Sequence, residues 1–162
     1  MLNYKESFLL LFIIFLIIFI ISYFYTKNKK RKEEVTNKKI IKNYMGFIFI
    51  IFGILKLYDL NKFTDIFSKY DLISQKIKIY PYLYPFIERI IGFILIKDIH
   101  IKEALITTIF LMFISIISII ISVNSGKVFR CGCLGSLFHL PLSYITLSEN
   151  IMMLFMSLNY LL

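Results

Sequence analysis

Cys131 and Cys133 are the residues whose type and spacing point most directly to chemistry, because they are the only two cysteines in the chain. Gly132 separates them, and a residue without a Cβ offers little resistance to a sharp bend between two thiols. The thiolate is the reactive form of cysteine, and the positive charge of Arg130 next to Cys131 would lower the thiol pKa. The pattern indicates a pair of thiols in a short polar segment between two long apolar ones.

Three interpretations of this pair remain open. In the first, which we favour, Cys131 and Cys133 exchange disulfides, their strained disulfide is a good oxidant, and His139 carries the proton. In the second, the two thiols bind Cu(I) together with His139 or a methionine. In the third, a disulfide staples the loop. The chain has no CxxC motif and no second cysteine pair, so redox work would need a separate partner. Such a partner would be a thioredoxin-like protein or an exported disulfide-containing protein. Whether the chain is itself an enzyme stays open, and we expect no cofactor beyond that Cu(I).

The elements that present this segment are long apolar runs. Apolar residues make up 59% of the 162 residues, and a helix that spans a bilayer needs roughly 20 of them in succession. We therefore predict an all-α, polytopic helical membrane protein, with a four-helix transmembrane bundle at residues 40–162. An N-terminal transmembrane anchor at residues 1–26 and a basic cytoplasmic linker at 27–39 precede it. The expected spans are 8–25, 40–58, 80–96, 101–123 and 140–162, with an interfacial helix over 62–79 and a cysteine loop over 124–139.

The net charge of +9 points to the membrane rather than to nucleic acid. Eight of the 19 Lys and Arg residues lie between Lys27 and Lys42, directly after the first apolar run, and basic clusters in that position set topology. With the N-terminus outside, ten basic residues are cytoplasmic and seven are outside. We expect a multi-pass protein of the bacterial inner membrane, in contact with the lipid bilayer, with a cytoplasmic C-terminus. Both cysteines would then be exoplasmic, where thiols can be oxidised.

Charged residues inside the expected spans form a second signal, because such groups are costly in a bilayer. Lys56 and Glu88 are expected at a similar depth near the outer face, where they could pair, and Glu149 could meet Arg89. We favour a structural role for these pairs over direct catalysis. Gly46 and Gly53 are seven residues apart and would allow a neighbouring helix to approach closely.

Four stretches of the chain carry a resemblance to a known family. They are GILKLYD at residues 53–59, the segment over 63–73, YPFIE at 84–88 with Gly92, and CGCLG at 131–135 followed by PLS at 141–143 and Asn150. In this pattern the chain resembles the MauE-type methylamine utilisation family, which is related to DoxX-like membrane proteins. It departs from the family at Leu134, where an aromatic residue is usual, and at Glu149, where arginine is expected. The resemblance implies a membrane accessory protein that supports maturation of an exported, disulfide-rich partner in methylamine metabolism.

Overall fold

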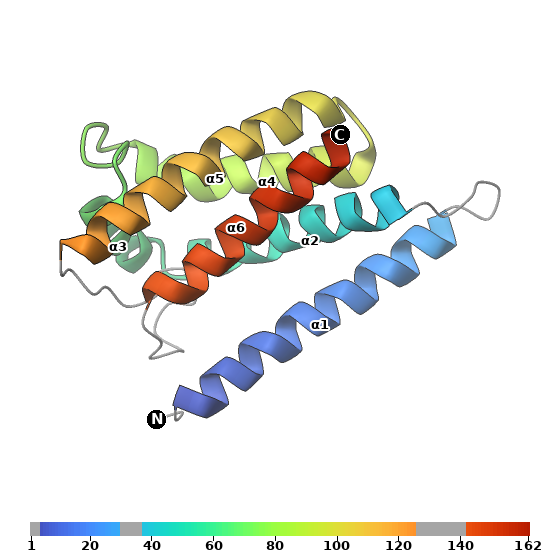
Figure 1. The fold of residues 1–162 in the computed structure, drawn as a ribbon, viewed down its shortest axis with the longest axis horizontal. Helices are drawn as coiled ribbons and strands as arrows, with labels where there is room; N and C mark the ends of the chain where they lie inside the picture. Colours follow the sequence, from blue (N-terminus) through green and yellow to red (C-terminus); the bar gives the residue numbers. More distant parts are fainter. Residues whose placement is uncertain (1–3, 30–36, 126–141) are drawn as a thin grey trace.

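The computed structural model describes residues 4–29, 37–125 and 142–162, and every regular element in these ranges is a helix (Figure 1). The helices are α1 (Tyr4–Lys29), α2 (Asn37–Tyr58), α3 (Leu60–Tyr70), α4 (Tyr80–Lys97), α5 (Ile101–Asn124) and α6 (Leu142–Leu161). The prediction of an all-α fold is confirmed.

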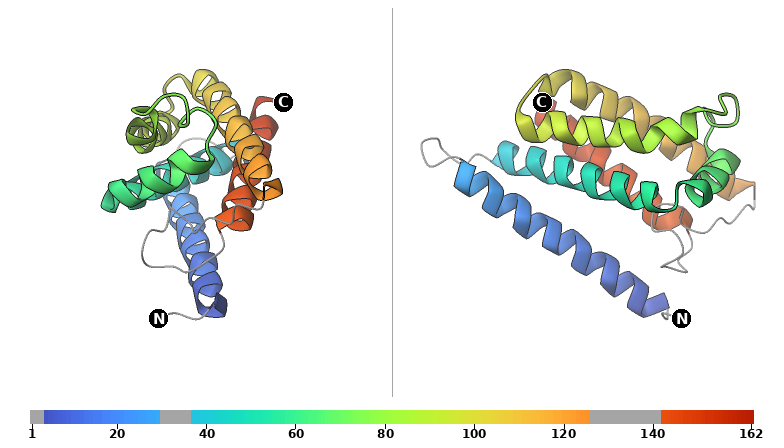
Figure 2. Two further views of the ribbon diagram at one scale, coloured as in Figure 1. Left: turned by 90° about the vertical axis from the view of Figure 1, so that its left-hand side faces the viewer. Right: turned by 180° about the vertical axis from the view of Figure 1, so that it is seen from behind.

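Three helices in the described part of the chain are long and apolar enough to cross a membrane. Their candidate spans are Leu11–Asn28, Asn37–Tyr58 and Ile101–Asn124. The helices α4 and α6 have 18 and 20 residues but carry charged and polar groups in their middle turns. They lie along α2 and α5 within the same bundle (Figure 2). Together with the many large apolar side chains left exposed on α1 and α5, this makes the chain a multi-pass helical membrane protein.

Two boundaries differ from the predicted ones. The expected linker over 27–39 is partly helical, because α1 continues to Lys29 and α2 begins at Asn37, while residues 30–36 lie outside the described ones. The expected surface helix over 62–79 ends at Tyr70. Asp71 ends it, since its carboxylate accepts hydrogen bonds from the following turn instead of leaving the backbone to continue the helix.

The helices alternate in direction, so that the connections gather at two ends of the bundle. One end holds the start of α1, helix α3, the end of α5 and the start of α6 (Figures 1 and 2). The other holds the end of α1, the start of α2, the turn between α4 and α5, and the C-terminus. Helices thus occur at the five predicted spans in the expected alternating order, and three of those in the described part of the chain are long and apolar enough to cross a membrane. Which end faces the outside stays a prediction.

The closest contact between two helices joins α2 and α4, which run antiparallel. A Cβ added to Gly92 would lie 2.6 Å from the carbonyl oxygen of Gly46, and one added to Gly53 would lie 3.0 Å from the carbonyl oxygen of Pro85. The opposing atoms belong to the backbone and cannot rotate away, so the contact at Gly92 has no room for a side chain and the one at Gly53 has almost none. The prediction that Gly46 and Gly53 allow close approach is confirmed, and Gly92 is their counterpart on α4.

This contact can be tested with Gly92→Leu. We expect the free energy of unfolding in detergent to fall by at least about 2 kcal/mol, because the clash outweighs the roughly 1 kcal/mol that replacing glycine contributes to helix formation. Ile54→Leu is the matched control, since Ile54 is exposed on α2 beside Gly53. This variant should change the free energy of unfolding by no more than about 0.5 kcal/mol. Denaturant titration followed by helical circular dichroism measures both, and equal stability of the two variants would contradict the close contact.

Candidate functional site

The residues predicted to carry the chemistry lie outside the described part of the chain. These are Arg130, Cys131, Cys133 and His139, so the redox, staple and Cu(I) interpretations all stay predictions. The described chain stops at Ser125 after α5 and resumes at Leu142 with α6. Both points lie at the end of the bundle that also carries α3 (Figure 1). The candidate site is therefore built from the described residues at this end.

Lys56 and Glu88 form a buried ion pair at this end. The Lys56 ammonium donates to both carboxylate oxygens of Glu88, at 2.5 and 2.6 Å, and each side chain is only 5% exposed. Lys56 lies in the last turn of α2, three residues beyond Gly53, and Glu88 lies on the facing side of α4. The close backbone contact at Gly53 brings the two groups within reach. The structure thus brings together two of the predicted supporting residues, whose part in any chemistry stays a prediction.

Aromatic rings from α3 and α4 cover this ion pair. The Lys56 nitrogen lies 4.9 Å from the ring centre of Tyr84 and 5.7 Å from that of Phe63. Phe67 packs on both rings, with centres 4.7 Å from Tyr84 and 5.0 Å from Phe63. Rings at these distances attract the ammonium through their negative faces while excluding water. The short helix α3 therefore acts as a cover that keeps the ion pair dry.

The turn after α3 is fastened to the end of α5. The Asp71 carboxylate accepts hydrogen bonds from the backbone N–H and the hydroxyl of Ser74, both at 2.8 Å. The N–H of Leu72 donates to the Ser118 hydroxyl on α5 at 3.1 Å. Burial raises the pKa of the Asp71 carboxyl above its ordinary value, and the hydrogen bonds from Ser74 oppose that shift. These contacts fix the surface from which the chain enters the cysteine segment.

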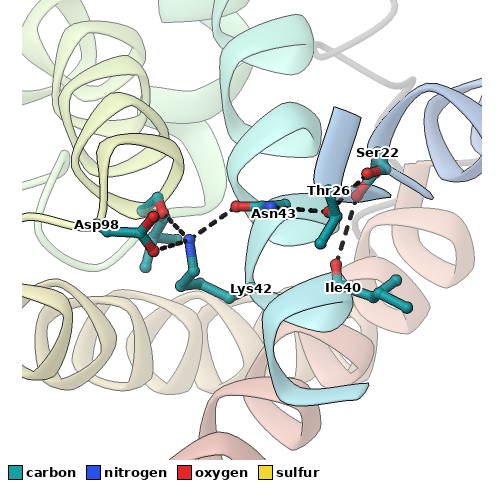
Figure 3. Close-up of polar contacts among 7 residues, drawn as sticks. Ser22, Thr26, Ile40, Lys42, Asn43 and Asp98 are labelled. Carbon is teal, nitrogen blue, oxygen red and sulfur yellow. Dashed lines mark hydrogen bonds and ion pairs between the residues drawn. The ribbon is translucent and has the colours of Figure 1, made fainter. Parts of the chain in front are cut away.

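A second ion pair, between a buried lysine and a partly exposed acid, lies at the opposite end of α2 and α4, and it was not predicted (Figure 3). The Lys42 ammonium is 2.7 Å from the carboxylate of Asp98, and it also donates to the Leu95 carbonyl and, at 2.7 Å, to the Asn43 side chain. The Lys42 side chain is 1% exposed, although the residue follows a run of basic residues in the sequence, so its burial was not predicted. The signal available in the sequence was an acid, Asp98, directly after the apolar run of α4.

The same network holds α1 against α2. The Asn43 amide donates to the Thr26 hydroxyl at 2.8 Å, and that hydroxyl donates to the Ser22 carbonyl at 2.7 Å (Figure 3). The Ser22 hydroxyl donates in turn to the Ile40 carbonyl at 3.4 Å. Ser22 and Thr26 are fully or almost fully buried. Polar groups on α1 thus meet polar groups on α2, and α1 docks in one defined register.

The expected contact between Glu149 and Arg89 is wrong. Glu149 lines a cavity together with Tyr44, whereas Arg89 lines a different cavity on the outer face of α4. The aliphatic stem of Arg89 packs over Gly53, and its side chain is exposed. The neighbouring Asn150 makes the contact that joins α6 to α5, since its amide donates to the Ser115 hydroxyl at 2.8 Å.

Comparison with known proteins identifies one family. The family model described as methylamine utilisation protein MauE matches residues 38–162, which include α2 to α6 and both cysteines. Helix α1 lies outside the matched range. No curated protein and no solved structure matches the chain.

The Lys56–Glu88 pair can be tested by a double-mutant cycle. We expect Lys56→Met to lower the free energy of unfolding by about 3–5 kcal/mol, because it leaves the Glu88 carboxylate buried without its partner. The double variant Lys56→Met with Glu88→Met should recover most of that loss. The exposed pair Lys69–Asp65 is the matched control, and Lys69→Met should cost at most about 1 kcal/mol. Strictly additive losses at Lys56 and Glu88 would show that the two groups do not interact.

The raised pKa of Asp71 predicts a pH dependence of opposite sign to that of a salt-bridged acid. The folded protein retains the Asp71 proton to higher pH than the unfolded chain does. Its contribution to stability is therefore complete below the ordinary carboxyl pKa of about 4 and is lost as the pH rises through the raised folded pKa.

The measurement is the difference in free energy of unfolding between wild type and Asp71→Asn across the acidic range. Asparagine keeps the acceptor oxygen but cannot titrate, so wild type should lose stability relative to the variant as the pH rises. Asp65→Asn changes an exposed acid on α3 and should leave the profile of the wild type unaltered. If the free energy of unfolding of the wild type instead rises relative to that of Asp71→Asn as the pH rises, the burial of this carboxyl is contradicted.

Proposed function

Since the chain belongs to the methylamine utilisation protein MauE family, we propose that this membrane accessory protein exchanges disulfides with an exported partner through Cys131 and Cys133. The observation that carries the proposal is that the family match includes the two cysteines of the chain together with helices α2 to α6. The family description connects its members with methylamine utilisation, and we include that process in the proposal.

The exchange proceeds in two steps that balance. A thiolate of the partner attacks one sulfur of the Cys131–Cys133 disulfide, which forms a mixed disulfide and releases the other cysteine as a thiolate. The second thiolate of the partner then attacks the mixed disulfide. The partner leaves with a disulfide, and Cys131 and Cys133 retain two electrons and two protons. A disulfide-bonded, thioredoxin-like protein would reoxidise the pair by the same exchange in reverse.

Four further residues have distinct parts in this proposal. The positive charge of Arg130 favours the thiolate form of Cys131, and His139 accepts and returns the proton. Lys56 and Glu88 contribute by holding α2 and α4 in register at the same end of the bundle. The chemistry requires an oxidising compartment, so we place this end on the outer side of the inner membrane, with the C-terminus in the cytoplasm.

The hydrogen-bonded turn after α3 supports the proposal from the structural side. Asp71, Ser74 and Ser118 connect that turn to α5, and α5 leads directly into the cysteine segment. A disulfide-exchange protein needs its thiols presented on a defined surface, because the partner's sulfur must approach along one direction. The fastened end of α5 supplies such a base.

Trapping of the mixed disulfide tests the proposal. In Cys133→Ser the Cys131 thiolate can attack the disulfide of the oxidised thioredoxin-like protein or, in the reverse exchange, that of the oxidised exported partner. This chain then has no second cysteine to resolve the mixed disulfide, so we expect a covalent complex that dithiothreitol releases. The double variant Cys131→Ser with Cys133→Ser should give none. The covalent complex is detected on non-reducing gels of cells whose thiols are quenched with acid and N-ethylmaleimide.

Two outcomes would contradict the proposal. If neither single variant forms a complex with an exported protein, while wild type holds an intramolecular disulfide that reductants attack slowly, the cysteines are a structural staple. If wild type is purified with copper that both single variants lose, the pair is a Cu(I) site.

A further inference from the structure

A cavity of about 360 Å³ lies where α1 and α6 meet the same face of α2. This volume falls at the lower end of the range for sites that bind small molecules. Helix α1 lies outside the family match, so the cavity combines helices of the matched range with one that lies outside it. The side chains that line it include Leu11, Phe12, Phe15, Tyr44, Glu149 and Met152.

The position of α1 over this cavity is fixed by specific contacts. Asn43 binds Thr26 at one end of α1, and ring contacts follow along the helix, with centres 5.6 Å apart for Phe19 and Tyr44 and 5.6 Å apart for Phe15 and Phe52. Ile18 is completely buried on the same face. The wall that α1 contributes is therefore a built surface and not a chance approach of an anchor helix.

The lining combines one carboxyl group with three aromatic rings. Glu149 lines the cavity from α6, while Phe12, Phe15 and Tyr44 supply the rings from α1 and α2. The Glu149 carboxyl and the Ser148 hydroxyl give an otherwise apolar lining a polar part, and ionisable groups within membrane helices commonly mark binding sites. A carboxylate and aromatic rings that line one cavity are together complementary to an organic cation, since both kinds of group attract positive charge.

Access to the cavity is from the lipid side. Phe12 is 59% exposed at its edge, on a face of α1 that is apolar along its length. A guest that enters there must dissolve in the bilayer, so its charge must be carried on an apolar body. We propose that this cavity binds a lipophilic ammonium ion, with the body against Phe12, Phe15 and Met152 and the N–H groups on Glu149. This site is independent of the disulfide exchange proposed above.

Binding of 4-phenylbutylammonium to the purified full chain in neutral detergent tests this proposal, with 4-phenylbutanol as its uncharged counterpart. Isothermal titration should show the ammonium ion binding about tenfold more tightly than the alcohol. Glu149→Gln should remove that preference and leave alcohol binding unchanged. Glu103→Gln is the matched control, because Glu103 is an exposed acid on α5 outside the cavity. This variant should bind the ammonium ion and the alcohol with the affinities of wild type.

A second variant removes part of the aromatic wall without disturbing the core. Phe12→Ala changes a side chain that is more than half exposed, and it should weaken ammonium binding several-fold while the helical content stays that of wild type. Equal affinity of wild type for the ammonium ion and the alcohol would overturn the proposal. The same holds if Glu103→Gln reduces the preference for the ammonium ion as much as Glu149→Gln does. The double cysteine variant should retain ammonium binding, which separates this site from the disulfide exchange.

Discussion

The contact between the backbones of α2 and α4 determines how the rest of the molecule is arranged. With no Cβ at Gly46, Gly53 or Gly92, the two helices approach until main-chain atoms meet. Lys42 and Lys56 lie about four helical turns apart on α2 and point to the same neighbour. Each finds an acid on or just after α4, so an ion pair closes each end of this antiparallel unit. The glycines set the distance between the helices, and the two ion pairs set their register.

The two ends of this unit serve different elements. At one end the network around Lys42 extends through Asn43 to Thr26 and so holds α1. At the other, α3 folds over the Lys56–Glu88 pair, and the turn after α3 is bound to α5. In a bilayer, where burial of apolar side chains gives helices little reason to associate, such polar contacts and close packing are the main sources of specificity. The turn after α3 and the cover over the Lys56–Glu88 pair are thus held in place by contacts among α2, α3, α4 and α5.

The sequence predicted the features that depend on composition and spacing alone. Apolar runs of about 20 residues indicated the helices, and the seven-residue spacing of Gly46 and Gly53 indicated the close contact. The pair of Lys56 and Glu88 followed from opposite charges at the joined ends of adjacent spans.

What the sequence left undetermined depends on the rotation of one helix against another. Glu149 lies on the side of Tyr44 and not of Arg89, because the hydrogen bond from Asn150 to Ser115 fixes the rotation of α6 about its own axis. No periodic pattern in the sequence reveals that rotation. Lys42 follows a run of basic residues in the sequence, and its burial depends on the packing of α2 against α4, which places it opposite Asp98.

The most direct test of the account is the sidedness of the cysteine segment relative to the two ends of the bundle. Intact cells should be treated with a membrane-impermeant maleimide after reduction. Cys131 and Cys133 of the wild type should react. A Gln75→Cys variant without the two native cysteines should also react, at its new thiol in the turn after α3. Lys102→Cys, beside the turn between α4 and α5, should react only after the membrane is opened. If instead the native cysteines and Lys102→Cys react together while Gln75→Cys stays protected, the arrangement of the bundle and the proposed exoplasmic chemistry are both contradicted.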